Sequence, residues 1–220
     1  MLVAGDDSSP AFDNGVDALA RLLTAQGVSD MRMLTASYKR FGPERGWATR
    51  ANLATALAGI APDEGEGCLV YMTSHGEERG LYLSRDAGGL LTPESLAAML
   101  DSACRQLPTI VVVSACHSGA FLKPLVARDN RILLTAARAD RASFGCSPTD
   151  ELTFYDRCFI MSFPLSDGWP GLHRDVARCV GAAEQRLTGI EPSEPQAFFG
   201  RLVRALPLPG LRSGGRSPNG

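Results

Sequence analysis

Residues 110–119 read IVVVSACHSG and contain the strongest strand signal in the chain. The first four are β-branched, and such a run favours extended structure buried on both faces of a sheet. The small and polar residues from Ser114 onward mark the place where the strand ends. The stretch therefore predicts a buried strand with Cys116 just beyond its carboxyl end.

A second apolar run, CLVYMT at residues 68–73, lies upstream and leads into His75. The chain between the two runs can hold a hairpin over residues 80–91 and a crossover helix that begins at Thr92. Sequential strands usually lie side by side, and parallel neighbours are about 4.8 Å apart. We therefore expect the His75 imidazole and the Cys116 thiol to emerge at the same edge of one sheet.

The rest of the chain alternates between strand and helix patterns. Further strands are predicted at residues 2–5, 31–36 and 131–136, and helices at residues 12–23, 51–58, 92–103, 152–161 and 172–187. Residues 39–47 read as a basic loop, and residues 197–206 as a last amphipathic segment. This alternation predicts an α/β fold with a mostly parallel sheet flanked by helices, and the chemistry of such sheets gathers beyond the carboxyl ends of the strands.

Length and composition suit a single soluble domain. The chain has 220 residues, and we assign residues 1–206 to one domain and residues 207–220, rich in Pro, Gly, Ser and Arg, to a disordered tail. A net charge of -2 gives no field for nucleic acid or for an anionic membrane. With no secretory signal and no apolar run of membrane length, we expect a cytoplasmic protein, although Met1 adjoins a predicted strand and the natural chain could begin earlier.

The six cysteines show no CxxC or CxxH spacing, so the sequence gives no support for a zinc site, and we expect neither a metal nor another cofactor. An even number permits disulfides. Because nothing marks the chain for secretion, we interpret all six as thiols. Five of them are expected to be packing residues, and Cys116 is the exception.

The residues around Cys116 and His75 fit nucleophilic catalysis. Gly76 leaves room for a substrate backbone, and its N–H can turn toward an oxyanion. Ser118 and Gly119 allow a tight strand-to-helix turn, in which a helix dipole would favour a thiolate. The less specific interpretations are a core cysteine and a histidine that only ends its strand. His117 adjoins Cys116, but consecutive side chains diverge, so we expect it to be structural.

These motifs resemble the His-Gly and Ala-Cys-x-Ser-Gly signatures of the legumain-like (C13) peptidases, which belong to the caspase-like cysteine peptidases. The resemblance rests on residues 2–5 (LVAG), 73–76 (TSHG), 114–119 (SACHSG), 133–137 (LLTAA) and 142–146 (ASFGC). It implies a caspase-like three-layer sandwich and a cysteine endopeptidase acting on peptides or proteins. It also implies that His75 and Cys116 form the dyad, with the N–H groups of Gly76 and Cys116 as the oxyanion hole.

The pocket residues of legumain are largely replaced. Aligned by eye, Asp13 and Asn14 stand opposite an Arg-His pair, and Ser114 stands opposite a Glu. Asp156 or Arg157 lies near the position of an Asp, and only Ser143 matches its counterpart. The resemblance therefore implies these six positions as substrate-binding candidates but does not carry over a preference for asparagine. Asp13 in the pocket would favour Arg or Lys at the cleavage position, whereas Arg157 would favour Asp or Glu.

Other functions stay open at this point. Metacaspases share the Cys-His-Ser-Gly string but carry an Asp where this chain has Ser114, and a peptide ligase would use the same acyl-enzyme. A caspase fold that has lost activity would serve as an interaction module. A flavodoxin-like ligand-binding domain would need a glycine-rich phosphate loop after the first strand, where Asp6 and Asp7 would repel an anion. The sequence does not indicate an oligomeric state.

Overall fold

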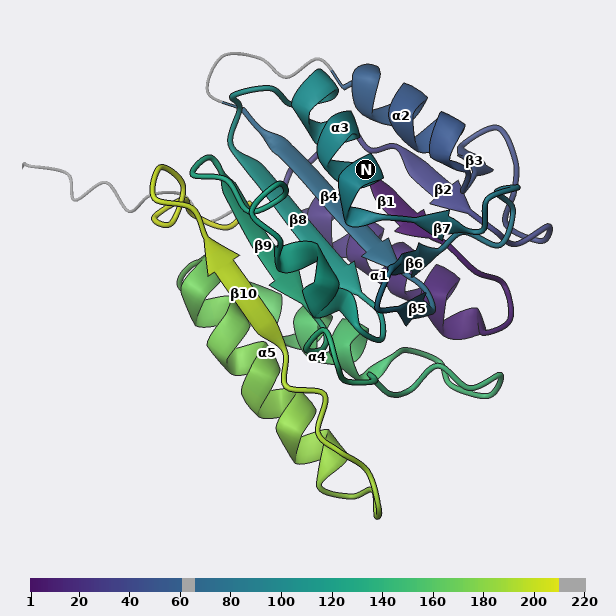
Figure 1. The fold of residues 1–220 in the computed structure, drawn as a ribbon, viewed down its shortest axis with the longest axis vertical. Coiled ribbons are helices and arrows are strands. Elements are labelled where there is room, and N and C mark those ends of the chain that lie inside the picture. Colours follow the sequence, from purple (N-terminus) through teal and green to yellow (C-terminus); the bar gives the residue numbers. More distant parts are fainter. Residues whose placement is uncertain (61–65, 210–220) are drawn as a thin grey trace, which may run out of the picture.

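A seven-stranded sheet forms the centre of the protein in the computed structural model, which describes residues 1–60 and 66–209 (Figure 1). Its order is β10-β9-β8-β4-β1-β2-β3. The strands are β1 (Leu2–Ala4), β2 (Met33–Thr35), β3 (Arg45–Trp47), β4 (Cys68–Thr73), β8 (Thr109–Ser114), β9 (Arg131–Thr135) and β10 (Gln196–Phe199). All neighbours pair in parallel except β10, which is antiparallel to β9. The predicted, mostly parallel sheet is therefore confirmed.

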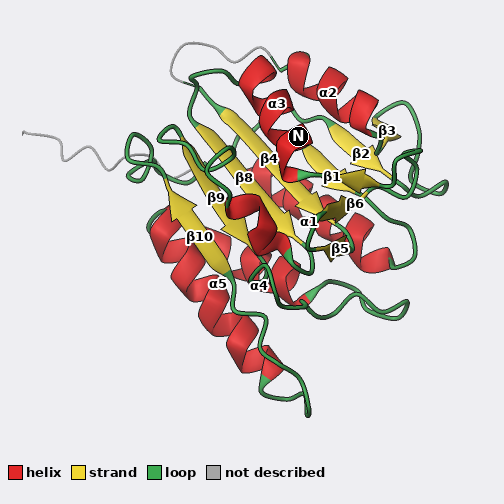
Figure 2. Ribbon diagram, viewed as in Figure 1, coloured by secondary structure: helices red, strands yellow, loops and turns green. Residues whose placement is uncertain are grey.

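Helices cover both faces of this sheet (Figure 2). On one face lie α2 (Arg50–Ala58) and α3 (Pro93–Ala103), and on the other lie α1 (Pro10–Ala25), α4 (Phe154–Ser162) and α5 (Trp169–Glu184). Because side chains alternate along a strand, Val111 and Val113 pack toward α2 and α3, while Ile110 and Val112 pack toward the other three helices. The molecule thus has two apolar cores and three layers.

Helix α1 begins where capping chemistry predicts a start. The Ser9 hydroxyl accepts a hydrogen bond from the backbone N–H of Ala11 at 3.2 Å, and Pro10 occupies the first turn. Only residues 5–9 separate this helix from β1. The amino end of α1 is therefore held at the carboxyl edge of the sheet, next to β4.

A small antiparallel sheet follows β4. It consists of β5 (Gly76–Glu77), β6 (Gly80–Tyr82) and β7 (Leu90–Leu91), so the hairpin predicted over residues 80–91 is present and has a third strand. Two short 3₁₀ helices, η1 (Ser118–Leu122) and η2 (Phe163–Leu165), complete the elements. Only Ser74 and His75 separate the end of β4 from the start of β5.

Some predicted boundaries differ from the structure. Residues 39–47 end in the short strand β3, and residues 197–206 begin within the edge strand β10 instead of forming one amphipathic segment. Both strands lie at an edge of the sheet and are too short for a clear alternating pattern. Leu208 is 1% exposed and belongs to the core beside α5, so its packing contradicts disorder at the start of the predicted tail. Residues 210–220 of that tail lie outside the described residues.

The cysteines contradict the interpretation that all six are thiols. Cys68 is bonded to Cys104, and Cys158 to Cys179. Sequence spacing did not reveal these pairs, because disulfide geometry depends on how the elements are packed in three dimensions. Cys116 and Cys146 are free. No helix within residues 1–60 and 66–209 is both long enough and apolar enough to cross a membrane.

Candidate active site

The ends of β4 and β8 bring His75 and Cys116 to the same level of the sheet. The two strands pair in register, with Thr73 opposite Ser114, and the Ser74 N–H donates to the Ser114 carbonyl at 3.1 Å. His75 and Cys116 each follow the last paired residue of their strand by two positions. Both are partly exposed. The strand register therefore puts the two residues at the same edge of the sheet.

Gly76 lies directly against the backbone of Cys116. A Cβ atom at this position would be 2.4 Å from the Cys116 carbonyl oxygen and 3.0 Å from the Cβ of Ala115. Contacts this short are not tolerated, so only glycine fits. The absent side chain lets the turn after His75 pack onto the turn that carries Cys116.

The Cys116 sulfur receives a hydrogen bond from a neighbouring loop. The Ser143 backbone N–H donates to it at 3.2 Å, and the Ser143 hydroxyl lies 3.8 Å away. The sulfur also lies 3.5 Å from the Ser143 carbonyl oxygen, to which a thiol can donate. Burial raises the pKa of the other free thiol, that of Cys146, and the nearby Cys116 raises it further. Of these two cysteines, Cys116 is the one that follows the end of β8, at the sheet edge of His75, and it is therefore the candidate nucleophile.

The chain after Cys116 turns sharply. His117 adopts a left-handed conformation with φ 55°, and its Nδ1 lies 2.9 Å from the Ala139 carbonyl oxygen. Gly119 packs so closely that a Cβ would be 2.5 Å from the Ala139 nitrogen. His117 thus has a backbone partner, in line with the structural role expected for it. The helix that follows is the five-residue η1, so the α-helix dipole expected at this turn is not available.

His75 contacts the segment that joins β1 to α1. Its Nε2 lies 3.0 Å from the Ser8 hydroxyl, and the same hydroxyl donates to the Asp6 carboxylate. The Phe12 ring meets the imidazole edge-on, with 5.1 Å between the ring centroids. Sequence reasoning missed Ser8 and Asp6. The available signal was their place directly after β1, whose carboxyl end meets the same sheet edge as His75.

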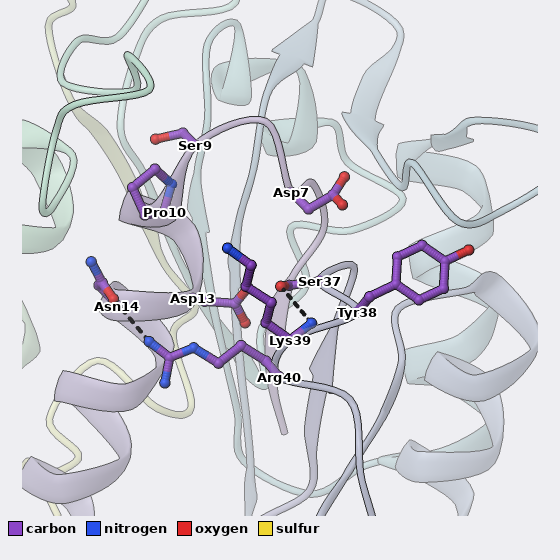
Figure 3. Close-up of a pocket in the computed structure, with 9 residues that line it drawn as sticks. All are labelled: Asp7, Ser9, Pro10, Asp13, Asn14, Ser37, Tyr38, Lys39 and Arg40. Carbon is purple, nitrogen blue, oxygen red and sulfur yellow. Dashed lines mark hydrogen bonds between the residues drawn. The ribbon is translucent and has the colours of Figure 1, made fainter.

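The same segment also lines a cavity of about 510 Å³ (Figure 3). It is lined by Asp7, Ser9, Pro10, Asp13, Asn14, Ser37, Tyr38, Lys39 and Arg40. Two of the predicted substrate-binding residues, Asp13 and Asn14, therefore line one cavity. The segment that bounds the cavity also contacts His75, through Ser8 and Phe12.

The Asp13 carboxylate in this cavity is already paired. Asp13 accepts a hydrogen bond from the Thr35 hydroxyl at 2.7 Å and forms an ion pair with Arg45 at 3.2 Å. Burial raises the pKa of Asp13, while the Thr35 hydrogen bond and Arg45 lower it again. Asn14 is also engaged, because its amide nitrogen donates to the Glu151 carbonyl at 3.0 Å and its oxygen accepts from Arg40 at 3.2 Å.

Ser114 and Asp156 lie beneath the site and not in the cavity. Asp156 is 0% exposed and accepts hydrogen bonds from the Tyr71 hydroxyl at 2.5 Å and the Thr73 hydroxyl at 2.7 Å. Burial raises the pKa of Asp156, and these hydroxyl donors lower it in part. Ser114 is 2% exposed, with its hydroxyl 3.4 Å from that of Thr153.

The six predicted substrate-binding residues are therefore not gathered in one pocket. Asp13 and Asn14 line the cavity, Ser143 contacts the nucleophile, and Ser114 and Asp156 tie the strand ends to α4. Arg157 is exposed on α4.

Comparisons with known proteins bear on the family and the fold. Residues 53–165, just over half of the chain, match the model of the Peptidase C13 family, and this range includes His75 and Cys116. The structure is similar to the crystal structure of caspase-1 from Spodoptera frugiperda, with a TM-score of 0.62 and 14% sequence identity over 89% of this chain and 82% of that chain. No curated protein sequence matches the chain. The protein belongs to the peptidase C13 family and has the caspase fold.

Proposed function

We propose that the protein is a cysteine endopeptidase that cleaves peptides or proteins through an acyl-enzyme on Cys116, with His75 as acid and base. The contact of Gly76 with the Cys116 carbonyl is the observation that carries this proposal, because the turn after His75 packs there against the turn that carries Cys116. Family membership supports a cysteine peptidase. The partly exposed Cys116, with a hydrogen-bond donor on its sulfur, supports it as the nucleophile.

The proposed reaction has two stages. The Cys116 sulfur attacks the carbonyl carbon of the scissile bond, and the N–H groups of Gly76 and Cys116 donate hydrogen bonds to the resulting oxyanion. His75 takes up the thiol proton and passes it to the leaving amine as the C–N bond breaks. His75 then accepts a proton from water, which attacks the thioester, and Cys116 regains its thiol as the acid product leaves.

In this proposal, substrate binds on both sides of the dyad. The loop of Ser143 lies next to the sulfur and can guide the peptide backbone, while the cavity of Asp13 and Asn14 takes a substrate side chain. Ser114 and Asp156 do not contact the substrate in this proposal. Their hydrogen bonds hold the ends of β8 and β4 against α4. Arg157 stays a candidate for contact with a longer substrate.

Alanine substitution, with matched controls, tests the mechanism. Cys116→Ala should lower kcat/KM on a peptide library by roughly 10⁴-fold or more and abolish labelling by an irreversible thiol-directed peptide probe. Cys146→Ala should leave both nearly unchanged. His75→Ala should cost roughly 10²- to 10⁴-fold, and His117→Ala much less. Folded Cys116→Ala protein with full activity would end this mechanism, and wild-type protein that resists the probe would favour a silent interaction module.

A further inference from the structure

The three residues Asp6, Ser8 and His75 form a continuous chain of hydrogen bonds. The Ser8 hydroxyl donates to Asp6 Oδ1, and its oxygen lies 3.0 Å from His75 Nε2. The Ser8 backbone N–H also donates to Asp6 Oδ1, at 2.8 Å. The backbone contact holds the carboxylate in place, so the hydroxyl bridges a fixed acid and the imidazole.

The direction of these bonds determines which imidazole nitrogen carries the proton. An ionised carboxylate can only accept hydrogen bonds, so the single hydroxyl hydrogen of Ser8 points to Asp6. The Ser8 oxygen then faces His75 Nε2 with lone pairs only, and Nε2 must supply the hydrogen. In the neutral ring, Nδ1 is consequently unprotonated and free to act as a base.

The other groups around the imidazole offer no competing acid. The Phe12 ring packs edge-on against it, and the His75 carbonyl accepts from the Tyr82 N–H at 2.9 Å. The neighbouring acids Asp7 and Glu77 pair with Arg85 and Arg79. Within residues 1–60 and 66–209, His75 forms no ion pair with an acid.

We propose that Ser8 and Asp6 position His75 for catalysis, with the Ser8 hydroxyl as a relay that fixes the Nε2–H tautomer and stabilises the imidazolium. This inference rests on the proposed function. When Nδ1 takes the thiol proton of Cys116, the ring becomes cationic and keeps its Nε2 proton. The Asp6 charge acts through Ser8 on that cation, and no proton moves along the relay.

The effect should be moderate, because Ser8 is exposed and Asp6 partly exposed. Loss of a buried carboxylate behind a catalytic histidine costs about 10⁴-fold in other hydrolases, and water weakens an exposed relay. We therefore expect Ser8→Ala to lower kcat by roughly 5- to 50-fold, with little change in KM. The acidic limb of the pH profile of kcat/KM should move to lower pH, because the imidazolium loses stabilisation.

Kinetics with conservative variants tests the relay. Asp6→Asn should have the same effect as Ser8→Ala, and the double variant should be no less active than either single variant. Ser8→Thr should restore both the rate and the position of the acidic limb of the pH profile. Asp30→Asn, which removes an exposed acid at the opposite edge of the sheet, is the control. Wild-type rates in Ser8→Ala, or an unmoved acidic limb, would overturn the relay. Absence of cleavage by the wild type would instead count against the proposed function.

A spectroscopic measurement tests the relay independently of activity. The chain has three histidines, so long-range ¹H–¹⁵N correlation spectra can be assigned by comparison with His75→Ala. The neutral His75 ring should carry its proton on Nε2 in the wild type and become a mixture of tautomers in Ser8→Ala. A proton on Nδ1 in the wild type, or identical spectra for both proteins, would overturn the relay whether or not the protein cleaves peptides.

Discussion

Gly76 is the residue at which sequence, packing and proposed chemistry meet most directly. Its missing side chain allows the turn after β4 to pack on the Cys116 carbonyl. The distance between His75 and Cys116 therefore depends on residue 76 carrying a hydrogen atom where alanine would carry a methyl group. Geometry of this kind is sensitive, because a displacement of about 1 Å can lower a rate by roughly 10²-fold.

Substitution of Gly76 should therefore damage activity more than stability. In Gly76→Ala the new methyl group would lie 2.4 Å from the Cys116 oxygen and push the two turns apart. We expect kcat/KM to fall by roughly 10²-fold or more and the free energy of unfolding to fall by about 1–3 kcal/mol. Peptide cleavage and urea unfolding measure both.

Gly181→Ala provides the matched control. Gly181 lies within α5, and apart from its chain neighbours and the nearby helix backbone no atom lies within 4 Å of the position that a Cβ would take there. Alanine at this position should raise stability by about 0.5–1 kcal/mol and leave activity unchanged. Equal activity of the two variants would show that the contact of Gly76 with Cys116 does not matter for cleavage.

Single residues were predictable where they followed a strong strand signal. His75 and Cys116 come directly after buried apolar runs, so their approach followed from the rules of parallel sheets. Ser8 and Asp6 did not stand out, because an Asp-Ser segment is typical of any turn and its contacts depend on where α1 starts. Asp156 was assigned to the pocket, yet it stands three residues after Thr153, whose hydroxyl caps α4 and accepts from the Asp156 N–H. That capping spacing was readable and pointed to a helix start instead.

At the scale of elements, the cavity is built by two segments that follow neighbouring parallel strands, β1 and β2. Its charges are largely paired with residues outside it: Asp7 with Arg85, Asp13 with Arg45, and Arg40 with Asp17. Lys39 is exposed and forms no ion pair within the described residues (Figure 3). The unbalanced charge of the cavity is therefore positive, in contrast to the expectation that Asp13 would favour Arg or Lys.

We accordingly expect substrates with an acidic side chain in this cavity to be cleaved faster than substrates with Arg or Lys there. An exposed pair is worth about 0.2–1 kcal/mol, which corresponds to a preference of roughly 1.4- to 5-fold. The preference should fall at high salt and disappear in Lys39→Ala, while Arg178→Ala, which removes an exposed charge on α5, should keep it. A peptide panel that varies one position at a time provides the measurement. A preference for Arg that is lost in Asp13→Asn would restore the expectation based on the sequence.

Elements in the middle of the sheet were predicted better than those at its edges. Strands β4, β8 and β9 are buried on both faces, and their apolar runs are unmistakable. Strands β3 and β10 contain only partly exposed residues, and each exists because a neighbouring strand offers hydrogen-bond partners. Such strands depend on tertiary context more than on local pattern.

At the scale of the whole molecule, each of the two apolar cores has its own disulfide. Cys68–Cys104 joins the start of β4 to the end of α3, and Cys158–Cys179 joins α4 to α5 on the other face. Disulfides of this kind persist in oxidising compartments, so they weigh against the cytoplasmic location expected from the sequence. Neither bond involves the strand ends that carry His75 and Cys116.

Thiol counting and unfolding measurements should distinguish a protein with two disulfides from a cytoplasmic protein with six thiols. Alkylation of denatured, unreduced protein should label only Cys116 and Cys146, and prior reduction should expose all six cysteines. The bonds close loops with sequence separations of 36 and 21 residues, so each should contribute about 2–4 kcal/mol to the free energy of unfolding. Reductant should lower the stability of the wild type and of Cys146→Ala equally, but not that of a variant in which the four paired cysteines are replaced by alanine. Because the bonds lie away from the sheet edge of His75 and Cys116, the proposed peptide cleavage by folded, reduced protein should continue. Six labelled thiols before reduction would show that the disulfides do not form and would support the cytoplasmic location.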